Sequence, residues 1–382
     1  MRGSLRFLHL GSLAALAAWM LALLWSYIAA VAARQRRHVG GGLADGGRPR
    51  RSRESCVVTG ASSGLGWALA CRLHAEGRHV VLACPDHDRG AAALQALLAG
   101  APRERRGTAT LKTLDLRDPA CVRDFARSLR RAETSGEVPP LGLVVLNAAS
   151  LPADEVWHPA AGAEGGFAAN CLGHALLVEM LLAKGAGSPG RVGPMGPLRV
   201  VNVTSFTHRC VRCTEAQQLV QALEERRVAG FLPSQAYHTS KWAALVLQGE
   251  LHRRRRRLGL RDYHLMHADP GAVDTALVRH WPVALRRAFP ALLRPCGLVA
   301  SPALAAARLL EAVELDGRGE GWNAAEGGRY RFCPVGGAVL APSTLAQSPR
   351  ETDHLWVACR GLAAWSSTCT TRPAARARRP TE

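Results

Sequence analysis

The chain has 382 residues, 48% of them hydrophobic, which is enough for one large α/β domain with additional segments. Its net charge of +19 would suit a nucleic-acid binder, but the arginines are scattered beside alanine and glycine, without zinc-finger spacing or interleaved aromatic residues. We therefore expect no nucleic-acid partner and favour contact with an anionic membrane surface. The cysteines form no disulfide framework, and the lone Cys-x-x-Cys of Cys210 and Cys213 is weak support for zinc, so we expect reduced thiols and no metal.

The N-terminal segment, residues 1–34, predicts a membrane anchor. No charged residue occurs from Leu10 to Ala33, and at about 1.5 Å per residue this run is long enough to cross a bilayer about 30 Å thick. More arginines follow the run than precede it, which places the rest of the chain in the cytosol. We expect a single-pass protein of the endoplasmic reticulum. A cleaved signal peptide ending at Ala30–Ala32 stays open, and so does a plastid or mitochondrial location, because the first acidic residue is Asp45.

The segments at the two ends of the main domain differ from it in composition. Residues 35–53 are rich in glycine and arginine and predict a flexible basic linker. At the other end we expect a helical extension over 336–366 and a basic, disordered tail over 367–382.

A glycine-rich turn opens the main domain. The apolar run Cys56–Val58 predicts a strand, and apolar residues at helical spacing from Trp67 to Leu73 predict the helix behind the turn. Gly60 permits the tight turn, Gly64 lets the backbone approach a pyrophosphate, and Gly66 permits close packing of helix on strand. The unit predicts a dinucleotide-phosphate site.

Further strands are predicted at 79–83, 109–114, 142–146 and 198–203, with helices between them. This alternation predicts a parallel, doubly wound sheet of the Rossmann type in a single domain, with right-handed crossovers. Ligands of such sheets bind at the carboxyl ends of the strands. The residues that follow predicted strand ends are Gly60, Asp115, Asn147, Ser205 and Asp269–Gly271.

The end of the second strand bears on the choice of cofactor. An acid there would bind a ribose 2′-hydroxyl, whereas an arginine would favour a 2′-phosphate. Cys84 and Pro85 are neither, but Arg89 follows closely and no acid competes at Cys84. We therefore favour NADP(H), with NAD(H) as the alternative.

Tyr237 and Lys241 are four residues apart, so they lie on one face of a helix. A free tyrosine has a pKa of about 10, and a neighbouring ammonium would lower it. The pair therefore predicts a tyrosine general acid/base.

Together these stretches resemble the short-chain dehydrogenase/reductase family over residues 54–335. Within it the chain is similar to the retinol dehydrogenase branch, which includes the X-chromosome-encoded dehydrogenase/reductase and the WW-domain oxidoreductase. The motifs that carry the resemblance are Thr59-Gly60-x-x-x-Gly64-x-Gly66, Asp115, Asn147-Ala148, Asn170-Cys171-Leu172-Gly173-His174, Ser205, Tyr237-x-x-x-Lys241, Pro270-Gly271 and Gly328-Arg329-Tyr330.

The resemblance implies a role for each catalytic position. Tyr237 would exchange the substrate proton, and Lys241 would lower the tyrosine pKa and hold the nicotinamide ribose. Ser205 would hydrogen-bond the substrate oxygen, and Asn170 would position a water that links Lys241 to solvent. The implied cofactor-binding residues are Gly60, Ser62, Ser63, Gly64, Leu65, Gly66, Arg89, Asp115, Leu116, Asn147, Ala148, Tyr237, Lys241, Pro270, Gly271, Val273 and Thr275.

Two positions depart from the family pattern: Ala149 replaces a glycine, and Pro85 stands where an NADP-favouring arginine is usual. With the anchor and the apolar stretch 281–299, the resemblance implies an oxidoreductase for a lipophilic alcohol, aldehyde or ketone of the retinoid, polyprenoid, steroid or fatty class. The alternative is a weakly active NADP-binding scaffold or redox sensor at a membrane. A homodimer stays open.

Overall fold

The computed structural model describes residues 18, 20–31, 54–100, 107–151, 155–183, 192–193, 196–260, 263–278, 287, 291–317, 328–335 and 338–362. The expected linker at 35–53 and the expected tail at 367–382 lie outside these residues, as do the first half of the predicted anchor and much of the apolar stretch 281–299.

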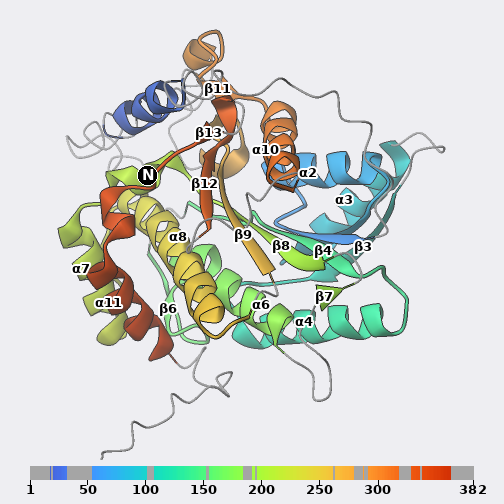
Figure 1. Ribbon diagram of the computed structural model, residues 1–382, viewed down its shortest axis with the longest axis horizontal. Coiled ribbons are helices and arrows are strands. Elements are labelled where there is room, and N and C mark those ends of the chain that lie inside the picture. Colours follow the sequence, from blue (N-terminus) through green and yellow to red (C-terminus); the bar gives the residue numbers. More distant parts are fainter. Residues whose placement is uncertain are drawn as a thin grey trace, which may run out of the picture.

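A mostly parallel sheet forms the centre of the domain, in the strand order β13-β12-β9-β8-β4-β1-β2-β3 (Figure 1). All neighbours in this order pair parallel except β13, which is antiparallel to β12. The order reverses at β1, so the predicted doubly wound sheet is confirmed. The strands are β1 (Ser55–Thr59), β2 (His79–Cys84), β3 (Thr108–Thr113), β4 (Leu141–Leu146), β8 (Gly196–Val203), β9 (Tyr263–Asp269), β12 (Arg329–Phe332) and β13 (Ala338–Val339), with β7 (Val192–Gly193) antiparallel on β8.

Helices cover both faces of the sheet (Figure 1). One face carries α2 (Gly64–Ala75), α3 (His87–Gly100) and α10 (Pro302–Gly317), and the other carries α4 (Pro119–Thr134), α6 (Gly173–Leu182) and α8 (Pro233–Arg257). Outside α8 lie α7 (Cys213–Glu224) and α11 (Pro349–Arg360). Shorter pieces are α5 (Gly165–Phe167), η3 (Ala168–Leu172), η4 (Phe206–Cys210), β10 (Ala272–Val273), β11 (Val299–Ala300), η7 (Cys333–Val335) and η8 (Thr344–Gln347).

Alternation along the central strands explains why the sheet is buried on both faces. Successive side chains of a strand point to opposite faces, so an apolar run supplies two cores at once. In β4, Val144 and Leu146 join the core beneath α4, α6 and α8, while Leu143 and Val145 join the core beneath α2, α3 and α10. All four side chains are almost fully buried.

Among the described residues, one helical stretch, Gly165–Leu182, is long and apolar enough to cross a membrane. It comprises α5, η3 and α6, and 78% of it is buried inside the protein. It packs against α4 and α8, so it serves as a core helix of the domain.

The described part of the predicted anchor is a shorter apolar helix, Met20–Val31, drawn in blue in Figure 1. One side of it packs on the domain: Leu23 and Ala30 are almost fully buried, and the Tyr27 ring meets Phe332 edge-on at 5.1 Å. The Tyr27 hydroxyl also donates to Gly297 O at 2.9 Å. The opposite side exposes Leu21, Leu24, Trp25, Ile28 and Val31. The helix is therefore apolar on two faces, and the domain buries only one.

A buried charge cluster lies where the chain enters β1. Glu54 is only 4% exposed and pairs with Arg78 at 2.6 Å and with Arg199 of β8. A Cβ on Gly142 would overlap the Glu54 carboxylate, so a glycine is required at the start of β4. The cluster ties β1 to β8 through charge in a nearly dry site, where removing one partner is costly.

We predict that Glu54→Gln lowers the free energy of unfolding by about 3 kcal/mol, because two guanidinium groups lose the charge that balances them. Urea unfolding followed by circular dichroism measures the change. The matched control is Glu225→Gln, which breaks an exposed ion pair with Arg227 and should alter stability little. Equal losses in the two variants would contradict a stabilising role for the Glu54 cluster.

Candidate active site

The glycine-rich turn joins β1 to α2 at the carboxyl edge of the sheet. Gly60 and Gly64 both have positive φ, at +67° and +56°, which side chains rarely adopt. A Cβ on Gly66 would lie 2.3 Å from Gly60 O and 2.5 Å from the Asn147 amide nitrogen. The positive φ of Gly60 fits the predicted tight turn, and the space around Gly66 fits the predicted close packing of helix on strand. The pyrophosphate role of Gly64 stays a prediction.

The N-terminus of α2 is open in a way that suits an anion. Ser63 occupies the N-cap position but makes no side-chain cap hydrogen bond within the described chain, and no acid lies in the first turn. Backbone N–H groups at such a terminus seek an acceptor, and the helix dipole favours negative charge there. Thr275 lies over this turn, since a Cβ on Gly64 would be 3.3 Å from its methyl group. The residues around the turn thus fit a pyrophosphate.

Asn147 fixes the neighbouring strand end. Its backbone N–H donates to the Thr59 hydroxyl at 2.9 Å, and its side-chain amide donates to Thr59 O at 2.9 Å. Ala148 N–H donates to the same hydroxyl at 2.9 Å. Asn147 and Ala148 therefore lie against the glycine turn, as expected for residues that line a cofactor groove.

The end of β2 gathers the residues expected to decide cofactor choice. The Ser62 hydroxyl and the Arg89 guanidinium both act on the buried thiol of Cys84, whose pKa is raised mainly by burial. Arg89 itself is exposed in the first turn of α3. A hydroxyl and a guanidinium beside an uncharged strand end form a setting that suits a 2′-phosphate.

Asp115 and Leu116 follow β3, but the Asp115 carboxylate is already engaged. It accepts hydrogen bonds from the Arg117 guanidinium at 2.8 and 3.0 Å and from Arg117 N–H at 2.9 Å. These hydrogen bonds lower the pKa of Asp115 although burial opposes them. Leu116 is buried, and its carbonyl lies close against Gly173. A cofactor role for either side chain stays a prediction.

The segment after β9 returns to the glycine turn. Gly271 has φ +71°, and a Cβ there would lie 2.6 Å from a Pro334 ring carbon. Pro270 and Gly271 turn the chain into β10, which contains Val273. Thr275 follows and reaches Gly64, so this segment lies against the glycine turn.

Ser205 and Tyr237 meet at the end of β8. Ser205 is the N-cap of η4, and its oxygen accepts from Thr207 N–H at 3.3 Å and from the Thr207 hydroxyl at 3.0 Å. Its own proton is therefore directed elsewhere, and a hydrogen bond joins it to Tyr237. Both residues are buried, at 8% and 6% exposure.

Lys241 lies on the same face of α8 as Tyr237, with its Nζ 6.0 Å from the centre of the tyrosine ring. The ammonium donates to Val203 O at 2.9 Å. Burial raises the pKa of Tyr237 above its usual value, although the hydrogen bond with Ser205 opposes this. The lowering of the tyrosine pKa by Lys241 stays a prediction.

Asn170 lies within a π-helical turn, η3, of the kind often found at functional sites. Its amide nitrogen donates to Ser150 O and to the Ser240 hydroxyl, both at 3.0 Å, and its oxygen accepts from Ser150 N–H at 2.9 Å. The side chain therefore joins the loop after β4 to α8. The expected water-positioning role of Asn170 stays a prediction.

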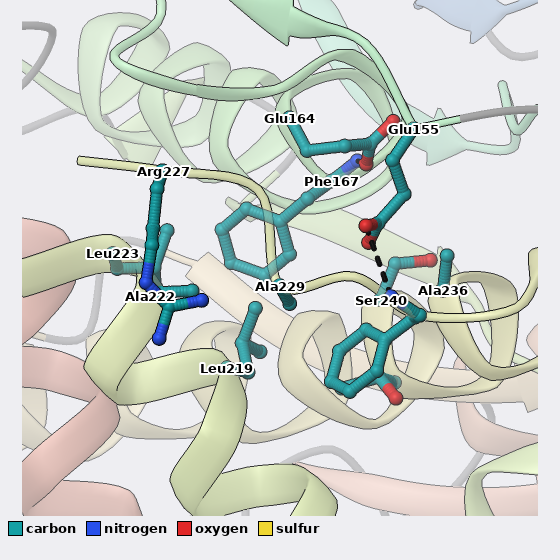
Figure 2. A pocket seen from close by; sticks show the side chains of 12 residues that line it. Glu155, Glu164, Phe167, Leu219, Ala222, Leu223, Arg227, Ala229, Ala236 and Ser240 are labelled. Carbon is teal, nitrogen blue, oxygen red and sulfur yellow. Dashed lines mark hydrogen bonds between the residues drawn. The ribbon is translucent and has the colours of Figure 1, made fainter. Parts of the chain in front are cut away.

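A small hollow of about 20 Å³ lies between α5, α7 and α8 (Figure 2). Glu155 and Glu164 point toward it, and the dashed line in Figure 2 is the hydrogen bond that Phe231 N–H donates to Glu155 at 3.0 Å. Burial raises the pKa of both carboxyls, although backbone donors oppose it. Neither Tyr237 nor Ser205 lines the hollow, so we do not assign the substrate to it.

The sequence patterns predict no catalytic role for Asp269, which interacts electrostatically with Lys241, or for Tyr330. Asp269 follows a predicted strand, and Tyr330 belongs to the Gly328-Arg329-Tyr330 motif. The two are hydrogen-bonded and fully buried. A charged residue in the otherwise apolar end of β9 was the one available signal in the sequence.

Comparisons with known proteins agree with this geometry. Residues 54–206 match the family model described as short chain dehydrogenase. The chain is 38% identical over 139 residues to protochlorophyllide reductase of Daucus carota, covering 36% of this chain and 32% of the relative. It is 40% identical over 129 residues to protochlorophyllide reductase A of Arabidopsis thaliana, covering 33% and 29%. The chain thus spans about a third of the length of these curated relatives.

Two solved structures share the fold. One is an uncharacterised protein from Mycobacterium Paratuberculosis, with a TM-score of 0.56, 24% identity and coverage of 84% of this chain and 97% of that one. The other is an actinorhodin polyketide ketoreductase with NADPH, with a TM-score of 0.51, 20% identity and coverage of 75% and 99%. Residues 54–206 thus match the short-chain dehydrogenase family, and the two solved structures show that the fold is shared.

Proposed function

We propose that the protein is an NADP(H)-dependent oxidoreductase that interconverts a lipophilic alcohol and its aldehyde or ketone. The main support for this function is that Ser205, Tyr237 and Lys241 lie close together. They lie at the same edge of the sheet as the glycine turn. A tyrosine acid/base, a second hydroxyl and an ammonium suit proton transfer to or from a substrate oxygen. The curated relatives are reductases by name, which supports the same class of reaction.

The chain's own residues divide the work as follows. Ser205 donates a hydrogen bond to the substrate oxygen, in place of its bond with Tyr237, and stabilises the negative charge that develops there. Tyr237 gives a proton to that oxygen in reduction and takes it back in oxidation. Lys241 supplies positive charge below the tyrosine ring. The nicotinamide cofactor, when bound, supplies or accepts the hydride.

NADP(H) is favoured over NAD(H) because Ser62 and Arg89 lie beside the uncharged end of β2. The ketoreductase structure that shares the fold contains NADPH, which supports the same choice. A lipophilic substrate is supported by the apolar helix Met20–Val31, which packs against Gly297 in the segment that precedes β11. Leu292 of that segment is 70% exposed.

We predict that Tyr237→Phe lowers kcat/KM for carbonyl reduction by about 10²–10⁴, because the proton donor is lost while the ring still packs. The measurement is NADPH oxidation with a panel of retinoid, steroid, polyprenoid and fatty carbonyls. Tyr263→Phe, a buried tyrosine on β9, is the control and should keep activity. A wild-type protein that binds NADPH but reduces none of these would favour the scaffold alternative.

We predict that Arg89→Ala weakens NADPH binding about tenfold and leaves NADH binding unchanged, because the guanidinium would contact only the 2′-phosphate. Fluorescence titration of the full-length protein measures both affinities. Arg127→Ala, an exposed arginine of α4 away from the groove, is the control. Equal loss for the two cofactors would show that Arg89 does not discriminate between them.

We also propose that the N-terminal segment holds the protein at a membrane of the endoplasmic reticulum, with the catalytic domain in the cytosol; an organellar membrane is the alternative. The outward side of Met20–Val31 is apolar and is followed in the sequence by Arg34, Arg36 and Arg37. Apolar side chains beside basic residues suit an anionic lipid surface. Residues 20–31 themselves lie along the domain, so their exposed face is the part available to lipid.

We predict that replacing both Leu24 and Ile28 with glutamate reduces flotation with phosphatidylserine-containing vesicles about tenfold or more, because charge would enter the lipid interface. Val357→Glu, an equally exposed apolar position on α11, is the control and should float like the wild type. Unchanged flotation of the double variant would contradict a lipid contact at this face. Sedimentation of the same samples tests the homodimer that the family resemblance leaves open.

A further inference from the structure

Asp269 is a fully buried acid at the end of β9. In the register of β8 and β9, Ala268 is the partner of Val203. Lys241 donates its hydrogen bond to Val203 O. Asp269 is therefore the next residue after the β9 partner of Val203, to which the Lys241 ammonium is hydrogen-bonded. The two opposite charges interact electrostatically.

Hydrogen bonds hold both oxygens of this carboxylate. Oδ1 accepts from Gly271 N–H at 2.8 Å, and Oδ2 accepts from the Tyr330 hydroxyl. Tyr330 comes from β12, where Phe332 pairs with Asp269 in the parallel register. A buried carboxylate with hydrogen bonds to both oxygens is kept in place and in its charged form.

The titratable groups around Asp269 come from several elements. Arg209 of η4 has its guanidinium 5.4 Å from the Tyr330 ring and 4.2 Å from the ring of Trp25 in the N-terminal helix. The groups that interact electrostatically with Asp269 are Lys241 and Tyr237 on α8, Tyr330 on β12, Arg209 on η4, Cys333 on η7 and Tyr27 on the N-terminal helix.

We propose that Asp269 is a positioning residue that holds Lys241 in the ammonium form and so sets the pH range in which the Tyr237–Lys241 pair works. The inference rests on the proposed function of that pair. Asp269 bonds Gly271 N–H of the proposed cofactor segment, and its charge acts on both Lys241 and Tyr237. The proposed role is its action on Lys241. Its carboxylate balances a charge that would otherwise be isolated in a buried site.

The sign of the effect follows from burial and charge. Burial lowers the pKa of Lys241 to about 8, and Asp269 opposes that fall. Burial also raises the pKa of Asp269 to about 6, although the hydrogen bond from Tyr330 opposes the rise. Between pH 6 and pH 8, therefore, both the Asp269 carboxylate and the Lys241 ammonium are charged. Without the carboxylate, Lys241 loses its proton at a lower pH.

The experiment is an NMR titration of the full-length protein with isotopically labelled lysine side chains. The sequence has only three lysines, Lys112, Lys184 and Lys241, and Lys241→Arg assigns the signal. In Asp269→Asn we expect the Lys241 midpoint to fall by about 1 pH unit or more. In the wild type, the Lys241 signal should also show a small inflection near pH 6 as Asp269 titrates.

Two matched variants separate charge from packing. Tyr330→Phe removes a hydrogen bond but keeps the carboxylate, so it should move the Lys241 midpoint less than Asp269→Asn does. Asp274 lies on the same segment as Asp269, but its carboxylate pairs with Arg294. Asp274→Asn should therefore leave the Lys241 midpoint unchanged. The proposal is overturned by an unchanged midpoint in folded Asp269→Asn, or by an equal shift in Tyr330→Phe.

If Asp269→Asn does not fold, the wild-type titration decides, because a Lys241 midpoint well below pH 7 would mean that Asp269 does not hold the ammonium form and would overturn the proposal. NADPH affinity measured on the same samples is a separate result. Failure of the wild type to bind NADPH would count against the proposed function, whereas the lysine midpoint reports only on the Asp269–Lys241 pair.

Discussion

The hydroxyl of Thr59 joins the ends of β1 and β4 at the point where the strand order reverses. It accepts hydrogen bonds from the backbone N–H groups of Asn147 and Ala148, and its oxygen lies 2.9 Å from Nε2 of the buried His174. Backbone N–H groups that follow the end of a strand have no ladder partner and need another acceptor. Thr59 supplies one, so the glycine turn and the loop after β4 are kept together.

The second constraint is electrostatic. Lys241, Asp269 and Tyr330 are buried within one region of the sheet edge, where an unbalanced charge would be expensive. The chain meets this by bonding the Lys241 ammonium of α8 to Val203 O of β8, next to Asp269 of β9, and by giving Asp269 two hydrogen bonds. The region that holds the candidate proton-transfer groups therefore depends on the register of two parallel strands.

The N-terminal helix adds a link between this region and the surface. Trp25 lies against Arg209, whose guanidinium also faces Tyr330, and Tyr27 packs on Phe332. The same helix presents apolar side chains outward. The segment that the sequence predicts as a membrane anchor thus also packs on the domain. One of its apolar faces contacts the domain, and the other is exposed.

Local sequence patterns are enough to predict the main strands and helices and the sheet edge at which they converge. Glycines at 60, 64 and 66, short apolar runs that alternate with helical spacing, and the Tyr237–Lys241 interval are local patterns, and backbone sterics and periodicity fix their outcome. What only the tertiary structure decided is the partner of each polar side chain. Lys241 bonds Val203 O, Asn170 bonds Ser150 and Ser240, and Asp115 bonds Arg117. Apart from the near neighbour of Asp115, these partners are distant in the sequence, and a buried polar group takes whichever partner the packing of strands and helices brings within reach.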